Sequence, residues 1–403
     1  MQPIKERIMD HLNTLSCEIG CRPVGTEANH AASVYIENVF RKSGLDIEIQ
    51  EFNVPVWQLD EAFIEFNGER LEAKANSFSQ ACEVSGDIIP FCTLEELAAS
   101  PDLEGKIVFL YGELSKENYI PKGFTIYNPD YHQKTIQLLE DKNPSVIVFV
   151  RMETEKNLPI INDWDFSVPS LTVTPEIGLK ILNNYLSSSA TCTIKSHREK
   201  GSTKNIIGRM KGTQEEKIIL AAHYDTVFGT DGAFDNASGV AVLLTLAEEL
   251  SNRNDWKSGF EFIAFSSEEY LGLGDEYYLK EHQRNLEKAM FAMNFDGVGQ
   301  TLGTNTITLM SGSNKLERCL KEIKKGFPSL QWTSPWYEST HYTFFSNGVP
   351  SIPFSSKGVS DLLHTKDDTI QWLSIEKLYE SYSIAFEIIT SLQGKTSKWT
   401  RES

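Results

Sequence analysis

The chain has 403 residues, of which 40% are hydrophobic and 23% are charged, a composition typical of a soluble globular protein with roughly two or three domains. Acidic residues outnumber basic ones by 56 to 38, and the formal charge of −18 would repel nucleic-acid phosphates and anionic lipid headgroups. We therefore expect neither nucleic acid nor a membrane as a partner.

The N-terminal region is predicted to form covering helices before a first strand. Apolar residues recur at helical spacing over residues 4–15 and 29–42, and residues 45–54 alternate as in a β-strand. The start of the chain lacks the apolar core of a secretory signal, and no run is long enough to span a bilayer. A cytoplasmic location is expected, and the 6 cysteines, which show no paired two-residue spacing, are expected to be free thiols.

The middle of the chain, residues 55–200, reads as a β-rich inserted domain between two parts of a main domain, 1–54 and 201–403. Short strands and turns are predicted over residues 62–66, 70–73, 106–111, 145–150 and 170–173, with helices over 93–99, 131–140 and 175–187. His132 and His197 stand alone in it and are interpreted as surface residues. Tyr127 and Tyr131 could reach a substrate, although aromatic residues in such a module more often belong to its core.

The main domain is predicted to be an α/β domain of three layers, with helices on both faces of a sheet. Strands alternate with helices after residue 204, which is the pattern of this architecture. The strands are predicted over residues 205–210, 218–222, 260–265, 289–295, 306–309 and 350–354, and the helices over 240–250, 275–281, 315–324 and 375–392.

Half of a metal site is indicated where the buried strand 218–222 ends. His223 would lie at the C-terminal edge of the sheet, where α/β proteins place their chemistry. The carboxylate of Asp225 could hydrogen-bond the far nitrogen of His223 and leave the other nitrogen free for a cation. Asp235 follows a glycine-containing loop and precedes a helix. A lone histidine at a strand end is more often a hydrogen-bonded core residue, so this stretch needs support from further along the chain.

That support comes from three later places. Glu268 and Glu269 follow the strand 260–265, and adjacent carboxylates at a strand end are unfavourable unless a cation or substrate requires them. Asp296 ends another strand, and His364 follows an apolar pair late in the chain. Nitrogen and oxygen ligands from several strand ends, with one carboxylate able to bridge, are typical of a two-metal hydrolytic site.

These motifs resemble, in order, those of metallopeptidase family 28, the co-catalytic zinc aminopeptidases of the aminopeptidase Y and bacterial leucyl aminopeptidase type. Five ordered elements are more specific than any single short pattern. The elements are His223-x-Asp225, Asp235-Asn236-x-Ser238-Gly239, Glu268-Glu269, Asn294-x-Asp296 and His364-Thr365. Residues 105–108 and 170–178 are similar, more weakly, to the protease-associated domain that many members carry as an insertion.

The resemblance implies two zinc ions per chain and a role for each motif. His223 and Asp296 would hold one zinc, Glu269 and His364 would hold the other, and Asp235 would bridge them. Glu268 would be the general base, and Asp225 would act from behind His223. Members also tend to have a cis peptide bond after the bridging residue, here Asp235-Asn236.

The chain departs from the family at Ser339-Thr340-His341, where members commonly have Ser-Asp-His. The loss of a carboxylate at Thr340 puts the hydrogen bonding around the site in doubt, but not the ligands themselves. His341 is a candidate partner for the substrate or an oxyanion, and an ordinary buried histidine is an equally good interpretation.

The expected function is a zinc exopeptidase, an aminopeptidase that acts on peptides with a free N-terminus. Several carboxylates converge on one site, which favours a compact cation such as an α-amine next to the scissile carbonyl. The alternatives are a glutaminyl-cyclase-like acyltransferase with a single zinc, a carboxypeptidase and a non-catalytic binding protein on the same scaffold. The same ligands would also suit cobalt or manganese, and the sequence predicts neither the side-chain preference nor the oligomeric state.

Overall fold

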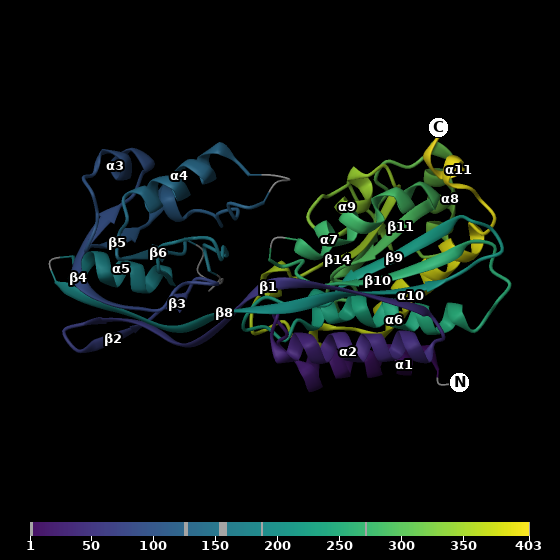
Figure 1. Ribbon diagram of the computed structural model, residues 1–403, viewed down its shortest axis with the longest axis horizontal. Coiled ribbons are helices and arrows are strands. Elements are labelled where there is room, and N and C mark those ends of the chain that lie inside the picture. The colour runs from purple at the N-terminus through teal and green to yellow at the C-terminus, as the bar shows by residue number, and fades with distance from the viewer. Residues whose placement is uncertain (1–2, 125–127, 153–158, 187, 271, 403) are drawn as a thin grey trace. The chain divides into compact units, whose positions relative to one another are not determined.

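The structure is a computed structural model that describes residues 3–124, 128–152, 159–186, 188–270 and 272–402 (Figure 1). It divides into two compact units, one formed by Met1–Val54 with Ser202–Ser403 and the other by Pro55–Gly201. The long strands β1 (Asp46–Phe66) and β8 (Ser189–Met210) each pass from one unit into the other. None of the helices in the described ranges is long and apolar enough to cross a lipid bilayer.

The larger unit is built on a mixed sheet with the strand order β13-β12-β14-β11-β9-β10-β8. Its strands besides β8 are β9 (Lys217–His223), β10 (Gly259–Phe265), β11 (Ala289–Phe295), β12 (Thr304–Ile307), β13 (Gln331–Trp332) and β14 (Ser351–Lys357). The central strands β14, β11, β9 and β10 are parallel, so their C-terminal ends lie at one edge of the sheet. β9, β10 and β11 are almost wholly buried, as expected for parallel strands covered on both faces.

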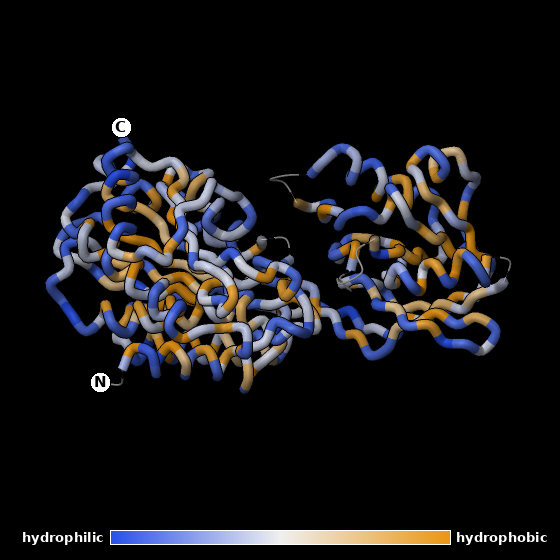
Figure 2. Tube along the Cα trace, turned by 180° about the vertical axis from the view of Figure 1, so that it is seen from behind, coloured by the Kyte–Doolittle hydropathy of each residue, from blue (hydrophilic) through white to orange (hydrophobic). Residues whose placement is uncertain are grey.

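Helices cover both faces of this sheet (Figure 1). One face carries α1 (Ile4–Asn13), α2 (Glu27–Lys42), α6 (Ser238–Ser251), α8 (Asn314–Lys325) and α10 (Ile375–Ser391), and the other carries α7 (Leu273–His282) and α9 (His341–Ser346). Alternate residues of β9 supply the two cores, Leu220 to the first and Ala221 to the second. The predicted three-layer α/β architecture is therefore confirmed. In Figure 2 the hydrophobic residues concentrate in the interior of this unit and the hydrophilic ones in its outer turns.

The smaller unit has a sheet and a core of its own. Its strands β4 (Cys82–Phe91), β5 (Ile107–Leu110), β6 (Val146–Val150) and β7 (Ser170–Val173) are parallel, β3 (Lys74–Ala75) is antiparallel to β7, and β2 (Glu69–Glu72) pairs with β1. The helices are α3 (Leu94–Ala99), α4 (Asp130–Asp141) and α5 (Pro175–Asn184). A separate hydrophobic cluster lies between these elements.

The sequence predicts positions for two tyrosines and two histidines of this unit, which can be compared with the structure. Tyr131 packs against Tyr119, with ring centroids 6.5 Å apart, whereas Tyr127 lies outside the described residues. The surface position expected for His132 is wrong, because His132 lies on the inward face of α4 and its Nδ1 accepts the N–H of Ile120 at 3.2 Å. His197 is exposed, as expected.

Candidate active site

The polar residues predicted to act together meet at the C-terminal edge of the larger sheet. His223 is the last residue of β9, and Asp296 directly follows the last residue of β11. Glu268 and Glu269 follow the end of β10, the strand that pairs with β9 on its other side. Because these three strands are parallel neighbours, their ends bring together side chains that are up to 73 residues apart in the sequence, from His223 to Asp296.

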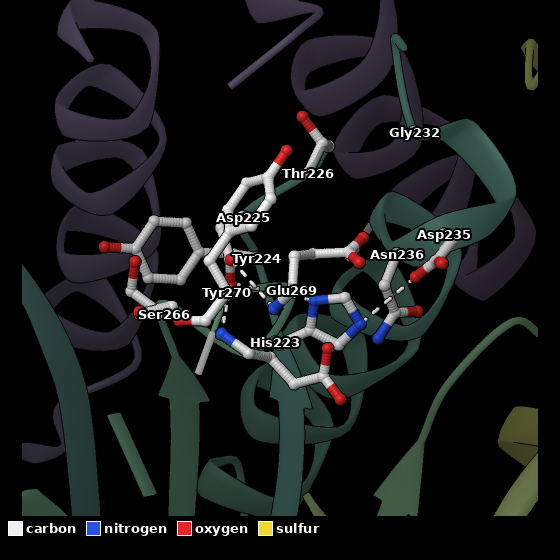
Figure 3. A network of polar contacts seen from close by, with 12 residues as sticks. His223, Tyr224, Asp225, Thr226, Gly232, Asp235, Asn236, Ser266, Glu269 and Tyr270 are labelled. Carbon is white, nitrogen blue, oxygen red and sulfur yellow. Dashed lines mark hydrogen bonds and ion pairs between the residues drawn. The ribbon is translucent and has the colours of Figure 1, made fainter. Parts of the chain in front are cut away.

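The Asp235 carboxylate lies between two histidines. Its Oδ1 is 3.1 Å from His223 Nε2, and its Oδ2 is 3.1 Å from His364 Nε2. Each histidine also contacts a second carboxylate, since His223 Nε2 is 3.4 Å from Asp296 Oδ1 and His364 Nε2 is 3.1 Å from Glu269 Oε2. Figure 3 shows the His223 ring directed at Asp235. The arrangement is two groups of one histidine and one carboxylate, joined by Asp235.

These donors fit divalent metal ions. Glu269 Oε1 is buried and accepts no hydrogen bond within the described ranges, and the buried Asp235 Oδ1 has only its ion pair with His223 there. A buried carboxylate oxygen without a donor is unfavourable unless a cation compensates it. The ligand atoms of His223, Asp235 and Glu269 lie within 4.8 Å of one another, and a set of imidazole nitrogens and carboxylate oxygens suits zinc and related ions.

The two histidines are held in their charged form by the surrounding carboxylates. Burial lowers the pKa of His223, but the charges of Glu268 and Asp296 outweigh it and raise the pKa well above its usual value. Burial also lowers the pKa of His364, but Glu269 and Asp235 together raise it to well above the usual value. Since metal ligands must be deprotonated, a cation that binds here displaces these imidazolium protons.

The carboxylates themselves differ in their affinity for protons. Burial raises the pKa of Glu268 well above its usual value, with His223 opposing this. Burial also raises the pKa of Glu269 to about 7, and the negative charge of Asp235 adds to the effect. Burial would raise the pKa of Asp235 too, but its contacts with His223 and His364 lower it overall. Asp235 is therefore the member that stays ionised between both histidines.

Asp225 does not make the contact that was expected of it. Its Oδ1 lies 3.7 Å from His223 Nδ1, which is too long for a hydrogen bond, because the imidazole ring is turned toward Asp235 and Asp296. Instead the two oxygens of Asp225 accept the main-chain N–H groups of Glu268 at 3.2 Å and Glu269 at 3.3 Å. Figure 3 shows Asp225 and Glu269 close together. Asp225 thus fixes the start of the loop that carries both glutamates.

Thr340 and His341 lie at the start of α9. Both are buried, and within the described part of the chain neither Thr340 Oγ1 nor His341 Nδ1 has a hydrogen-bond partner. His341 Nε2 donates to the Trp336 carbonyl at 2.8 Å, and burial lowers the pKa of His341, so its Nδ1 is an unprotonated acceptor. Asn294 on β11 donates to Ser339 at 2.9 Å and ties this segment to the site. A role of His341 in substrate binding stays a prediction.

Three residues that hold the site together have no structural role in the predictions from the sequence, although Asn236 belongs to one of the motifs. Asp368 accepts the N–H groups of Phe234 and Asp235, Arg22 donates to carbonyl groups of the loop before them, and Asn236 donates to the Phe295 carbonyl at 2.8 Å. Asp368 lies three residues after the motif His364-Thr365, and this closeness is the signal that could have marked it. The peptide bond between Asp235 and Asn236 is cis, as the resemblance implied.

Comparisons with known proteins find similarity to aminopeptidases. Residues 205–389 match peptidase family M28. The chain is 27% identical over 390 residues to aminopeptidase YwaD of Bacillus subtilis, with 92% of this chain and 81% of that protein covered. It is 24% identical to the probable lipoprotein aminopeptidase LpqL of Mycobacterium tuberculosis, over 72% of this chain and 58% of that one.

Solved structures show the same fold over almost the whole chain. The aminopeptidase from Aneurinibacillus sp. strain AM-1 superposes with a TM-score of 0.77 at 21% identity, covering 99% of this chain and 96% of that one. The Bacillus subtilis zinc aminopeptidase BSAP superposes with a TM-score of 0.76 at 22% identity, covering 100% and 99%. The match of residues 205–389 therefore assigns this part of the chain to peptidase family M28, and the superpositions show that the whole chain shares the fold of these aminopeptidases.

Proposed function

We propose that the protein is a zinc-dependent aminopeptidase that uses two metal ions to remove residues one at a time from the N-terminus of peptides. The observation that carries the proposal is the position of Asp235, whose two oxygens face two histidines that each have a carboxylate of their own. The similarity to YwaD, which is named an aminopeptidase, and to BSAP, which is described as a zinc aminopeptidase, supports the proposal.

The two metal ions are assigned to the two groups of donors. His223, Asp296 and Asp235 would hold one ion, and His364, Glu269 and Asp235 would hold the other. When bound, such ions polarise the scissile carbonyl group and lower the pKa of the attacking water.

Glu268 is the general base in this proposal. Its main-chain N–H is fixed by Asp225, and its side chain lies close enough to His223 and Asp296 for their charges to shift its pKa. The carboxylate accepts a proton from the attacking water and passes it to the nitrogen of the leaving amine. A pKa raised by burial makes the Glu268 carboxylate a stronger base, which favours the first step, the acceptance of a proton from water.

The charges around the site favour a free amine over a free carboxylate. Glu268, Glu269, Asp235 and Asp296 are negative groups that two divalent ions neutralise only in part. Arg22 is a cation close enough to interact with Asp235, but it is fully buried and donates to five main-chain carbonyl oxygens. Arg22 is therefore not free to bind a C-terminal carboxylate, as a carboxypeptidase would require.

For the unit Pro55–Gly201 we propose the character of a protease-associated domain. The two segments on which that resemblance rests lead into β5 and include β7 with the start of α5, and both strands belong to the core of the unit.

One peptide prepared in three forms tests the proposed activity on the zinc-loaded protein. The free and C-amidated peptides should both lose their N-terminal residue, whereas the N-acetylated peptide should stay intact. Cleavage of the acetylated form with protection by amidation would show a carboxypeptidase. A peptide with N-terminal glutamine, followed by mass spectrometry, and metal analysis of the same sample would reveal a cyclase with a single zinc.

A further inference from the structure

The loop that leads to Asp235 has no regular secondary structure of its own. Residues 224–232 form neither helix nor strand, and Gly229 and Gly232 have positive φ angles of 82° and 54°. A Cβ atom on Gly232 would lie 2.4 Å from the Asp235 carbonyl oxygen, so the close turn before Asp235 requires glycine. Glycines leave a loop many alternative conformations, so other contacts must select the one that places Asp235.

Arg22 holds this loop from one side. Its guanidinium is fully buried, and it donates to the carbonyl oxygens of Asp231 at 2.7 Å and Gly232 at 3.0 Å. The Nε of Arg22 donates to the Tyr224 carbonyl at 2.6 Å, directly after His223. The remaining bonds reach the carbonyls of Leu15 and Gly20 at the end of the N-terminal helical segment. One side chain thus connects the loop before Asp235 to the strand end that carries His223.

Asp368 holds the same loop through its N–H groups. Its Oδ1 accepts from Phe234 N at 2.7 Å, and its Oδ2 accepts from Asp235 N at 3.0 Å. Asp368 is fully buried and lies four residues after His364, so it also connects Asp235 to the segment that carries the second histidine. Its charge and that of Arg22 attract each other across the loop, which offsets part of the cost of burying both.

We propose that Arg22 and Asp368 form a loop clamp that positions the bridging carboxylate of Asp235 before any metal binds. Both are positioning residues, since they contact main-chain groups of the loop and none of the side chains assigned to the metals. Because Asp235 belongs to both groups of donors, a shift of its backbone changes the coordination of both ions at once. The inference rests on the proposed two-metal function and adds that the geometry is set by this buried pair of charges.

The pair cannot be replaced by similar residues without loss. In Asp368→Asn the amide nitrogen would face one of the two N–H groups, so one accepted hydrogen bond becomes a repulsion between donors. In Arg22→Lys the positive charge is kept, but an ammonium has three donors and cannot reach five carbonyl groups. Both variants keep the approximate size of the side chain. Arg22→Lys also keeps the charge, so its effect reports the hydrogen bonds, whereas Asp368→Asn removes both a hydrogen bond and the charge that faces Arg22.

The first test compares Asp368→Asn and Arg22→Lys with the wild type in two measurements. Zinc affinity is measured by competition with a chelator, and the absorption spectrum is recorded for the cobalt(II)-loaded proteins. Zinc affinity should fall about 10- to 100-fold, as is typical when groups that orient metal ligands are lost. The cobalt absorption bands should shift, because the coordination geometry changes. The matched control is Arg209→Lys, which alters a partly buried arginine contact elsewhere, at 2.7 Å to Glu261 near the start of β10.

The inference would be overturned if both clamp variants had the same zinc affinity and cobalt spectrum as the wild type. It would also be overturned if Arg209→Lys changed zinc affinity and the cobalt spectrum as much as the clamp variants do. The second test needs no variant and no metal. In the metal-free wild-type protein, hydrogen exchange should show the N–H groups of Phe234 and Asp235 protected like those of the central strands. Rapid exchange there would show that the clamp does not form before metal binding. Failure of the wild type to bind zinc would instead refute the proposed function and leave the exchange result to decide the clamp.

Discussion

Glu268→Gln tests the proposed base with almost no change in shape. The main-chain N–H of residue 268 keeps its acceptor, Asp225, at 3.2 Å, and the amide has nearly the volume of the carboxyl group. General-base catalysis contributes about 10²- to 10⁴-fold to a rate, which corresponds to about 2.7 to 5.4 kcal/mol of transition-state stabilisation. The kcat should fall by this factor, while KM should change little because the metal ligands stay in place.

The assay combines steady-state cleavage of a peptide with a free N-terminus and elemental analysis of the same protein sample. Zinc per chain should match the wild type, because Glu268 is assigned to neither ion. Glu276→Gln is the matched control, since Glu276 is an exposed glutamate in the first turn of α7, and it should leave both values unchanged. Undiminished turnover at normal zinc content would refute the base. A parallel loss of zinc and turnover would show that Glu268 is a ligand.

Three further predictions concern the metal ligands and their surroundings. Asp235→Ala should lose both ions and all activity, and elemental analysis that still finds two ions with full activity would rule out the bridge. Asp225→Asn should lower kcat and zinc affinity together, because one of the N–H groups of Glu268 and Glu269 loses its acceptor; an unchanged kcat would contradict this. In the metal-free protein the pKa values of His223 and Glu269 are raised, so the folded state binds more protons than the unfolded state. The melting temperature of the chelated protein should therefore fall as pH rises from about 4.5 through 7, and a rise over this range would contradict the sign.

The sequence was sufficient where local pattern and parallel topology decide the outcome. The apolar run before His223 predicts a buried strand, and parallel strands bring their ends to one edge. The grouping of His223 with Glu268, Glu269 and Asp296 therefore follows from strand ends, whereas Asp235 and His364 arrive from segments outside these strands. The free cysteines are also confirmed. The first half of β8 was missed because its residues 197–200 are polar and exposed, which removes the alternation that marks a strand.

Contacts across long sequence distances could not be read from the sequence. Arg22 lies 202 residues before Tyr224, and Asp368 lies 133 residues after Asp235, so no spacing rule connects them. Asp225 was assigned the wrong partner because the orientation of the imidazole ring depends on Asp235 and Asp296, which arrive from other elements. His132 illustrates the same limit, since its position on the buried face of α4 depends on which side of that helix meets the sheet.

The chain leaves the larger unit along β1 and returns to it along β8. This connection would allow the smaller unit to be deleted from the chain. β1 and β8 are paired strands, and near the boundary Ser202 donates to Glu51 at 2.6 Å while Asn205 donates to Gln50 at 2.8 Å. The two crossing points are therefore neighbours in space, so a short hairpin turn could join them with little loss of chain entropy. An ancestor could acquire or lose such a segment in one step of recombination without disturbing the strands that carry His223 and Asp296. The same short connection would allow a chain without the smaller unit to be produced. Such a chain would show which peptides the larger unit selects by itself.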